Sequence, residues 1–196
     1  MIGSSRLLVL YISEYLGRSR IGAVVSRFSS LNNVKAGEYL THCDIVDSED
    51  WGKRCSLLIA VHSNYSANDL KWEVHPQEIG VDSGQAGIFD MAYYRKDGIE
   101  MQTPKVGYDG QPFDRLEAML KSEEEGNDFY LKMCKFSLSE KKWGGFGNGV
   151  VSSSGFGDGG YILYVAKDGD EVIGFCIDYL VQEEELSIKF PFLILN

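Results

Sequence analysis

Two short segments combine glycines with an aspartate directly beside strand-forming residues. They are IGVDSGQAGIFD (residues 79–90) and VVSSSGFGDGGYILYV (residues 150–165). Glycine permits positive φ angles and close backbone approach, and a neighbouring carboxylate can accept hydrogen bonds from turn amides. The same carboxylates could instead bind a cation or a polar ligand. The candidate ligand-binding residues are therefore Asp82, Ser83, Gly84, Gln85, Asp90, Ser154, Gly157, Asp158 and Tyr161.

The favoured interpretation of SGFGDGGY is a tight turn that starts a core strand. It is not a phosphate-binding loop, because no Gly-Lys-Ser/Thr follows, and its G-x-G-x-x-G spacing leads into a strand instead of a helix. The oxygen ligands of an EF-hand are also missing after Asp82. We expect no cofactor. The alternative is a metal-dependent hydrolase that binds Ca²⁺ or Mg²⁺ through Asp82, Asp90 and Asp158.

Other catalytic arrangements have weaker support. A Ser/His/Asp set can be assembled only on paper, from Ser154, His62 and Asp158, and no G-x-S-x-G nucleophile motif is present. His42 and Cys43 are neighbours, so in a strand they would face opposite sides and could not bind one zinc ion together. The sequence therefore favours a binding function over an enzymatic one.

Cysteine usage and the lengths of the apolar segments indicate the cellular compartment. The four cysteines form no C-x-x-C pair and lie in apolar surroundings, which indicates buried free thiols in a reducing compartment. The apolar run at residues 7–12 is too short for a signal peptide, and no run is long enough to span a membrane. We expect a cytoplasmic protein.

The formal net charge of −10 disfavours nucleic acid and anionic membranes as partners. It suits cations or a basic protein partner. Small acidic proteins with an exposed sheet edge often bind another protein, as toxin-neutralising immunity proteins or phage-defence accessories do. The tail KFPFLILN, residues 189–196, would add an apolar patch if it were exposed.

The pattern of apolar residues predicts an α+β fold, in which a mostly antiparallel β-sheet has one or two helices inserted in the middle of the chain. Strands are expected at residues 6–12, 21–28, 38–46 and 55–63, with a strand–turn–strand within 72–90. Residues 29–37 have the composition of a loop. A hairpin around an Asp-Gly turn joins 160–167 to 171–180.

Helical spacing of apolar residues predicts a helix over residues 112–125. Residues 127–138 fit a helix or a strand, and we favour the helix. The glycine-rich stretch 143–149 is interpreted as a linker or a lid. Residues 181–196 are expected to form a C-terminal edge strand, since Pro191 suits an edge. With no linker or repeat visible, residues 1–196 are expected to form a single domain.

The chain resembles a bacterial family of domains of unknown function over residues 34–180. The family pattern has V-D-[AS]-G with a later aspartate, then S-G-x-G-D-G-x-Y-P, then a strand ending Asp-Phe. The matching residues here are Val81, Asp82, Ser83, Gly84, Asp90, Ser154, Gly155, Gly157, Asp158, Gly159, Tyr161, Asp178 and Tyr179. Ile162 and Tyr179 replace the usual Pro and Phe, and the tail after Leu180 is longer. The resemblance implies a compact domain with the two loops close together. The family has no established activity, so no catalytic role is carried over from it.

Overall fold

The computed structural model describes residues 5–11, 29–96, 98, 100–120, 127–146 and 149–180. Strands of a mainly antiparallel sheet make up the largest share of them, and two helices are inserted between β7 and β8, which confirms the α+β class. The strands are β1 (Ser5–Tyr11), β2 (Ser29–Val34), β3 (Tyr39–Asp47), β4 (Lys53–His62), β5 (Trp72–Val74), β6 (Ile79–Val81), β7 (Gln85–Asp90), β8 (Trp143–Phe146), β9 (Gly149–Ser153), β10 (Gly159–Asp168) and β11 (Glu171–Asp178). The helices are α1 (Asp114–Leu120) and α2 (Asn127–Ser137), with 3₁₀ turns η1 (Glu49–Trp51) and η2 (Ala67–Asp69).

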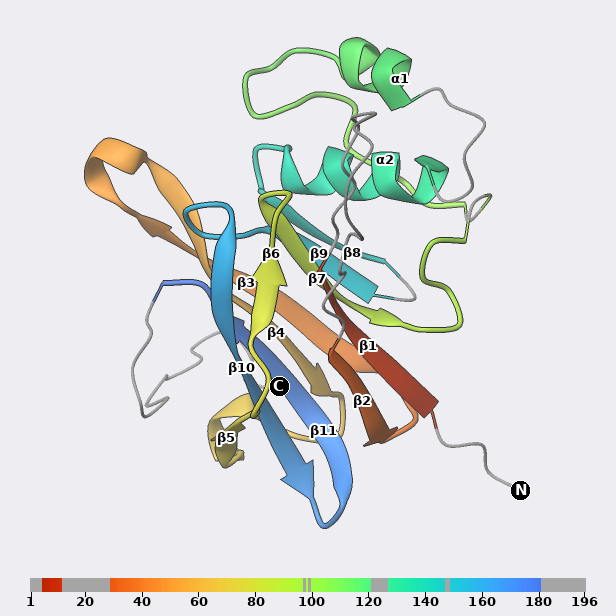
Figure 1. Ribbon diagram of the computed structural model, residues 1–196, viewed down its shortest axis with the longest axis vertical. Helices are drawn as coiled ribbons and strands as arrows, with labels where there is room; N and C mark the ends of the chain where they lie inside the picture. Colours follow the sequence, from red (N-terminus) through yellow and green to blue (C-terminus); the bar gives the residue numbers. More distant parts are fainter. Residues whose placement is uncertain are drawn as a thin grey trace, which may run out of the picture.

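The strands pair in the order β3-β4-β11-β2-β1-β7-β9-β8, and β10 pairs with β11 on one edge and with β5 and β6 on the other. One bridge, Val172 to Val34, joins β11 to β2 in parallel, whereas the other pairs are antiparallel. In Figure 1 the helices lie together at one end of the molecule, over β7, β8 and β9, and the β10–β11 hairpin extends away from them.

The sheet curls so that β3 and β8, the two ends of the pairing order, come close together. The rings of His42 and Trp143 meet edge to face with centroids 5.6 Å apart. A Cβ placed on Gly145 would lie 3.1 Å from Oγ1 of Thr41. The curled sheet encloses the main core, formed by Leu31, Val34, Cys43, Cys55, Leu58, Ala60, Ile79, Val81, Ala86, Ile88, Val150, Tyr161, Leu163, Val165, Val172, Phe175, Ile177 and Tyr179.

Helix α2 packs on the outer face of β7, β8 and β9 through a second cluster, formed by Phe89, Phe129, Met133, Phe136 and Val151. Glycines in these strands make room for the rings. A Cβ on Gly144 would lie 2.0 Å from the Phe136 ring, and one on Gly87 would lie 2.4 Å from the Phe89 ring. The interpretation of residues 143–149 as a linker or lid is therefore wrong for residues 143–146 and 149, because these glycines belong to β8 and β9.

The opposite outer face of the sheet, on β4, β10 and β11, is covered by the segment between β4 and β5. Tyr65, Leu70 and Trp72 pack there against the buried side chains of Leu57, Ile59, Val61, Ala67, Tyr164 and Cys176. Both faces of the central strands are thus buried, which agrees with their nearly continuous apolar sequence. Within the described ranges, no helix combines the length and the apolar character needed to cross a lipid bilayer.

The strands expected at 38–46 and 55–63 and the 160–180 hairpin are present, and residues 127–137 are helical. The loop expected at 29–37 is wrong over residues 29–34. This polar segment forms β2 because β1 and β11 supply backbone partners on its two sides, and Leu31 and Val34 are buried. The strands expected at 21–28 and 181–196 lie outside the described residues, as do residues 121–125 of the expected helix.

Candidate functional site

The two glycine-aspartate segments lie against each other. Strand β6 pairs with the first residues of β10, with Val81 opposite Gly159 and Ile79 opposite Tyr161. The backbone amide of Gly84 donates a 2.9 Å hydrogen bond to Oδ1 of Asp158. The amide of Ser154 donates a 2.9 Å bond to the carbonyl oxygen of Gly84. The loops at residues 82–84 and 154–158 therefore form one continuous surface.

The second loop is a tight turn held by its own polar groups. The amide of Gly157 donates to the Ser154 carbonyl at 2.6 Å, and the Ser154 hydroxyl donates to the Gly157 carbonyl at 2.8 Å. The buried Tyr161 hydroxyl also donates to the Gly157 carbonyl, at 2.6 Å. Gly155 and Gly157 have φ angles of 37° and 106°, which residues other than glycine rarely adopt. Ser154, Gly157 and Tyr161 thus hold the turn.

Two carboxylates remain exposed on this surface, those of Asp82 and Asp158. Partial burial, and next the nearby charge of Asp158, raise the pKa of the Asp82 carboxyl above its usual value. Between them, the Ser83 hydroxyl is shielded from solvent and has no hydrogen-bond partner among the described residues. The carboxylates of Asp82 and Asp158 can accept hydrogen bonds from a partner molecule or form ion pairs with it.

Two candidates point elsewhere. The side chain of Gln85 is buried, where its Oε1 accepts a 2.7 Å bond from the Ser137 hydroxyl and its Nε2 donates to the Cys134 sulfur at 3.4 Å. Asp90 lies at the far end of β7, about 17 Å along the strand from Gln85, and caps a turn through a 2.8 Å bond from the Ala92 amide. Gln85 therefore attaches β7 to α2, and Asp90 does not meet the other aspartates.

The metal site and the Ser/His/Asp set considered from the sequence both require side chains that lie close together. The described part of the chain contains no group of three or more His, Cys, Asp or Glu side chains that could hold a metal ion, so Asp82, Asp90 and Asp158 do not form such a group. The Ser154 hydroxyl donates within its own turn. His62 lies 3.3 Å from the Ala36 carbonyl and accepts a bond from the Asn64 amide. Ser154 and His62 thus have separate partners.

An exposed aromatic pair stands beside the second loop. Trp51 is 67% exposed and Phe156 is 59% exposed, and their rings meet edge to face with centroids 5.9 Å apart. Trp51 belongs to the turn between β3 and β4. Its amide donates a hydrogen bond to the Ser48 carbonyl, and the Gly52 amide donates one to the Glu49 carbonyl. Phe156 lies between Gly155 and Gly157 of the other turn. Both rings are therefore positioned by hydrogen-bonded turns.

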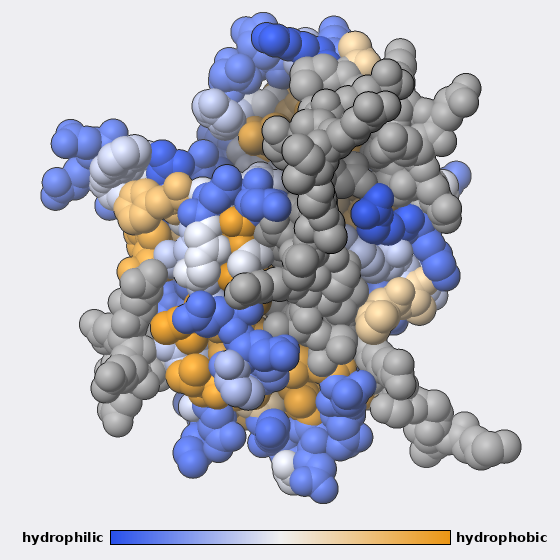
Figure 2. Space-filling model, in the orientation of Figure 1, coloured by the Kyte–Doolittle hydropathy of each residue, from blue (hydrophilic) through white to orange (hydrophobic). Residues whose placement is uncertain are grey.

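Exposed carboxylates lie in or next to the two turns that carry these rings, and in the loop that is hydrogen-bonded to the second turn. We call the whole set the aromatic–acidic surface: Trp51, Phe156, Asp47, Glu49, Asp50, Asp82 and Asp158, with both rings and all five carboxylates exposed. In Figure 2 the β3–β4 turn projects at the upper left, with hydrophilic residues at its tip. The sequence analysis missed Trp51 and Phe156. The sequence did carry a signal for them. Trp51 lies in the polar turn DSEDWG and Phe156 in the glycine turn SGFGDG, and an aromatic ring in such a turn is difficult to bury.

Comparison with known proteins identifies a family. The model of the family described as "Protein of unknown function (DUF4241)" matches residues 29–177. The comparisons with curated proteins and with solved structures gave no match. The resemblance to a family of unknown function is thereby confirmed, whereas the assignment of the two glycine-aspartate motifs to its pattern stays a prediction.

Proposed function

Since the chain belongs to the DUF4241 family, which is described as proteins of unknown function, we propose its function from the geometry: it is a binding module that holds a basic segment of another protein on the aromatic–acidic surface. The observation that carries the proposal is the Trp51–Phe156 pair, two large exposed rings in contact with each other, on turns that also carry exposed carboxylates.

The aromatic pair would supply most of the binding free energy. Tryptophan is enriched among the few residues that dominate protein interfaces, and truncation of such a residue costs 2 kcal/mol or more. A ring held in advance loses little conformational freedom when a partner covers it. Hydrogen bonds fix the turn that carries Trp51, and the glycine conformations fix the turn that carries Phe156. The surface is thus prepared for an apolar anchor from a partner.

The charges select a basic partner. Along the chain, the basic residues next to the acidic β3–β4 turn are Lys53 and Arg54, which begin β4. Lysine and arginine side chains of a partner would meet Asp82 and Asp158 on one side of Phe156 and Glu49 and Asp50 beside Trp51. Complementary charge raises the association rate and excludes acidic partners, and salt weakens it. Binding should therefore decrease as ionic strength rises.

The test is a peptide selection on the wild type, followed by binding measurements on two variants. A random peptide library is selected on the wild type, and the binders are titrated calorimetrically against wild type, Trp51→Ala/Phe156→Ala and a control, Tyr108→Ala. Tyr108 is 65% exposed and lies outside the aromatic–acidic surface. The enriched peptides should carry Lys or Arg beside an aromatic or aliphatic residue. Loss of one dominant aromatic contact should weaken binding about 30-fold or more.

Tyr108→Ala should bind as the wild type does, and 0.5 M salt should weaken the wild-type complex. Selected peptides that are acidic, or that bind the double variant as tightly as the wild type, would overturn the proposed function. Equal melting temperatures of the three proteins are required, because a destabilised variant would lose binding for another reason.

A further inference from the structure

A pocket of about 600 Å³ opens on the helical side of the molecule, away from the aromatic–acidic surface. Three segments form its walls: residues 102–106, the end of α2 with the turn that follows it (136–141), and β8. This volume lies within the range of pockets that bind small molecules, which are mostly apolar with a few polar groups. None of its lining residues belongs to the aromatic–acidic surface.

Backbone hydrogen bonds hold the walls in place. The amide of Tyr108 donates to the Leu138 carbonyl at 2.8 Å, which ties the chain after residue 106 to the end of α2. The amide of Gly107 donates to the Gln111 carbonyl at 2.8 Å, and Val106 pairs with Pro112. Because these bonds fix both sides, the pocket exists before any ligand binds.

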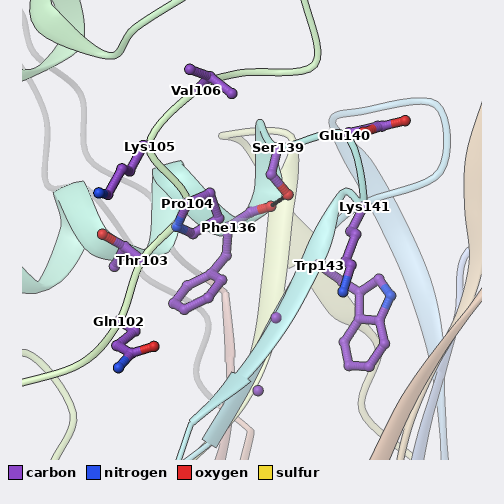
Figure 3. Close-up of a pocket in the computed structure, with 12 residues that line it drawn as sticks. Gln102, Thr103, Pro104, Lys105, Val106, Phe136, Ser139, Glu140, Lys141 and Trp143 are labelled. Atoms are coloured by element: carbon purple, nitrogen blue, oxygen red, sulfur yellow. Dashed lines mark hydrogen bonds between the residues drawn. The ribbon is translucent and has the colours of Figure 1, made fainter. Parts of the chain in front are cut away.

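Aromatic and apolar side chains line the pocket. The ring of Phe136 lies directly on Gly144 of β8, which has no side chain to displace it. In Figure 3 the Phe136 ring points into the space between the segment 102–105 and β8. Pro104, Val106 and the indole of Trp143 add further apolar surface. A flat apolar group can therefore stack in the pocket against an aromatic ring.

Two lysines give the pocket its charge. In Figure 3, Lys141 extends beside the indole of Trp143, and Lys105 lies on the other side of Phe136. Neither ammonium group forms an ion pair with a carboxylate of the described residues, whereas the neighbouring Lys135 is paired with Glu117. Only one carboxylate, that of the exposed Glu140, lines the same pocket. In a protein with a net charge of −10, this is a local excess of positive charge.

We propose that this pocket binds a small planar aromatic or heterocyclic anion, with its ring against Phe136 and Pro104 and its acidic group at Lys105 or Lys141. The proposal concerns binding alone. A carboxylate, sulfonate or phosphate would present the same charge to the two ammonium groups.

The test uses two probes that differ by one sulfonate group. 1-Anilinonaphthalene-8-sulfonate is an anion with a planar naphthalene ring, and N-phenyl-1-naphthylamine has the same rings without the sulfonate. Both are titrated by fluorescence into the full chain, at low salt, with wild type and Lys105→Gln/Lys141→Gln. The control is Lys71→Gln/Lys167→Gln, which removes two exposed positive charges elsewhere. We expect one site per chain and at least tenfold tighter binding of the sulfonate by the wild type and the control.

The Lys105→Gln/Lys141→Gln variant should keep its affinity for the neutral probe and lose the preference for the anion. Filling the pocket with Val106→Trp should abolish binding of both probes, whereas Val74→Trp, at another exposed valine, on β5, should not. Equal affinity for the two probes in the wild type, or binding that survives Val106→Trp, would overturn the proposal. Neither result bears on peptide binding by Trp51 and Phe156, so the two proposals fail separately.

Discussion

The amide of Gly84 and the carboxylate of Asp158, 74 residues apart in the chain, are joined by a 2.9 Å hydrogen bond. Gly84 has a φ angle of 65°, a conformation that glycine adopts without strain. The bond therefore connects two turns whose backbone geometry is already set. It makes Asp158 a structural residue as well as a member of the aromatic–acidic surface.

We expect Asp158→Ala to lower the free energy of unfolding by about 1 kcal/mol, because a hydrogen bond to a charged group is lost at an exposed site. Asp158→Asn keeps a side-chain oxygen as acceptor and should cost less than half as much. Urea denaturation at pH 7 measures both changes. If the two variants were equally stable, the Gly84–Asp158 bond would not hold the turns together.

Gly144→Ala should destabilise the fold by about 1–3 kcal/mol, because the added methyl group would overlap the Phe136 ring, which lies 2.0 Å from the position of a Cβ. The control is Gly80→Ala in β6, where a Cβ would meet nothing within 4 Å. Thermal unfolding of both variants is the measurement. A Gly144→Ala protein as stable as the Gly80→Ala protein would contradict the packing of α2 on β8.

Asp82→Asn should stabilise the protein slightly at neutral pH. Partial burial and the charge of Asp158 raise the pKa of the Asp82 carboxyl, so the folded state disfavours its ionised form. The stability linked to this group is present below the usual carboxyl pKa and is lost as pH rises through the raised value. Solvent screening keeps the effect below about 1 kcal/mol.

The measurement is the urea midpoint of wild type and Asp82→Asn at several pH values between 3 and 7. The advantage of the variant should appear only above the usual range of carboxyl pKa values. A stabilisation of equal size at every pH would show that the charge of Asp82 is not its cause.

Gln85→Leu should lower the free energy of unfolding by about 1–3 kcal/mol, since it removes buried hydrogen bonds to Ser137 and Cys134. The double variant Gln85→Leu/Ser137→Ala should lose less than the sum of the two single variants, because neither side then has a polar group that lacks its partner. Denaturation of all four proteins gives this coupling, and strict additivity would refute it. Amide exchange in α2 should quicken in Gln85→Leu, since its attachment to β7 is weakened.

Local sequence was sufficient for the elements whose signals are local. Residues 55–62 are nearly all apolar and become the buried centre of the sheet, and the turn Asp168–Asp170 closes the β10–β11 hairpin. The helix at 127–137 follows from apolar residues spaced at helical intervals, although the same residues also fitted a strand. Contact of Phe129, Met133 and Phe136 with β7 and β9 decided between the two.

The sequence by itself determined the α+β class, the turn chemistry of the two glycine-aspartate segments and an acidic surface, because these depend on residue type and short-range spacing. Only the tertiary structure decided that the polar residues 29–34 form a strand, since neighbouring strands supply the hydrogen bonds. It also placed Trp51 beside Phe156 and Asp82 beside Asp158, and it separated Asp90 from both. Such pairs join residues far apart in the chain, and their proximity arises from the pairing of β6 with β10 and the curl of the whole sheet.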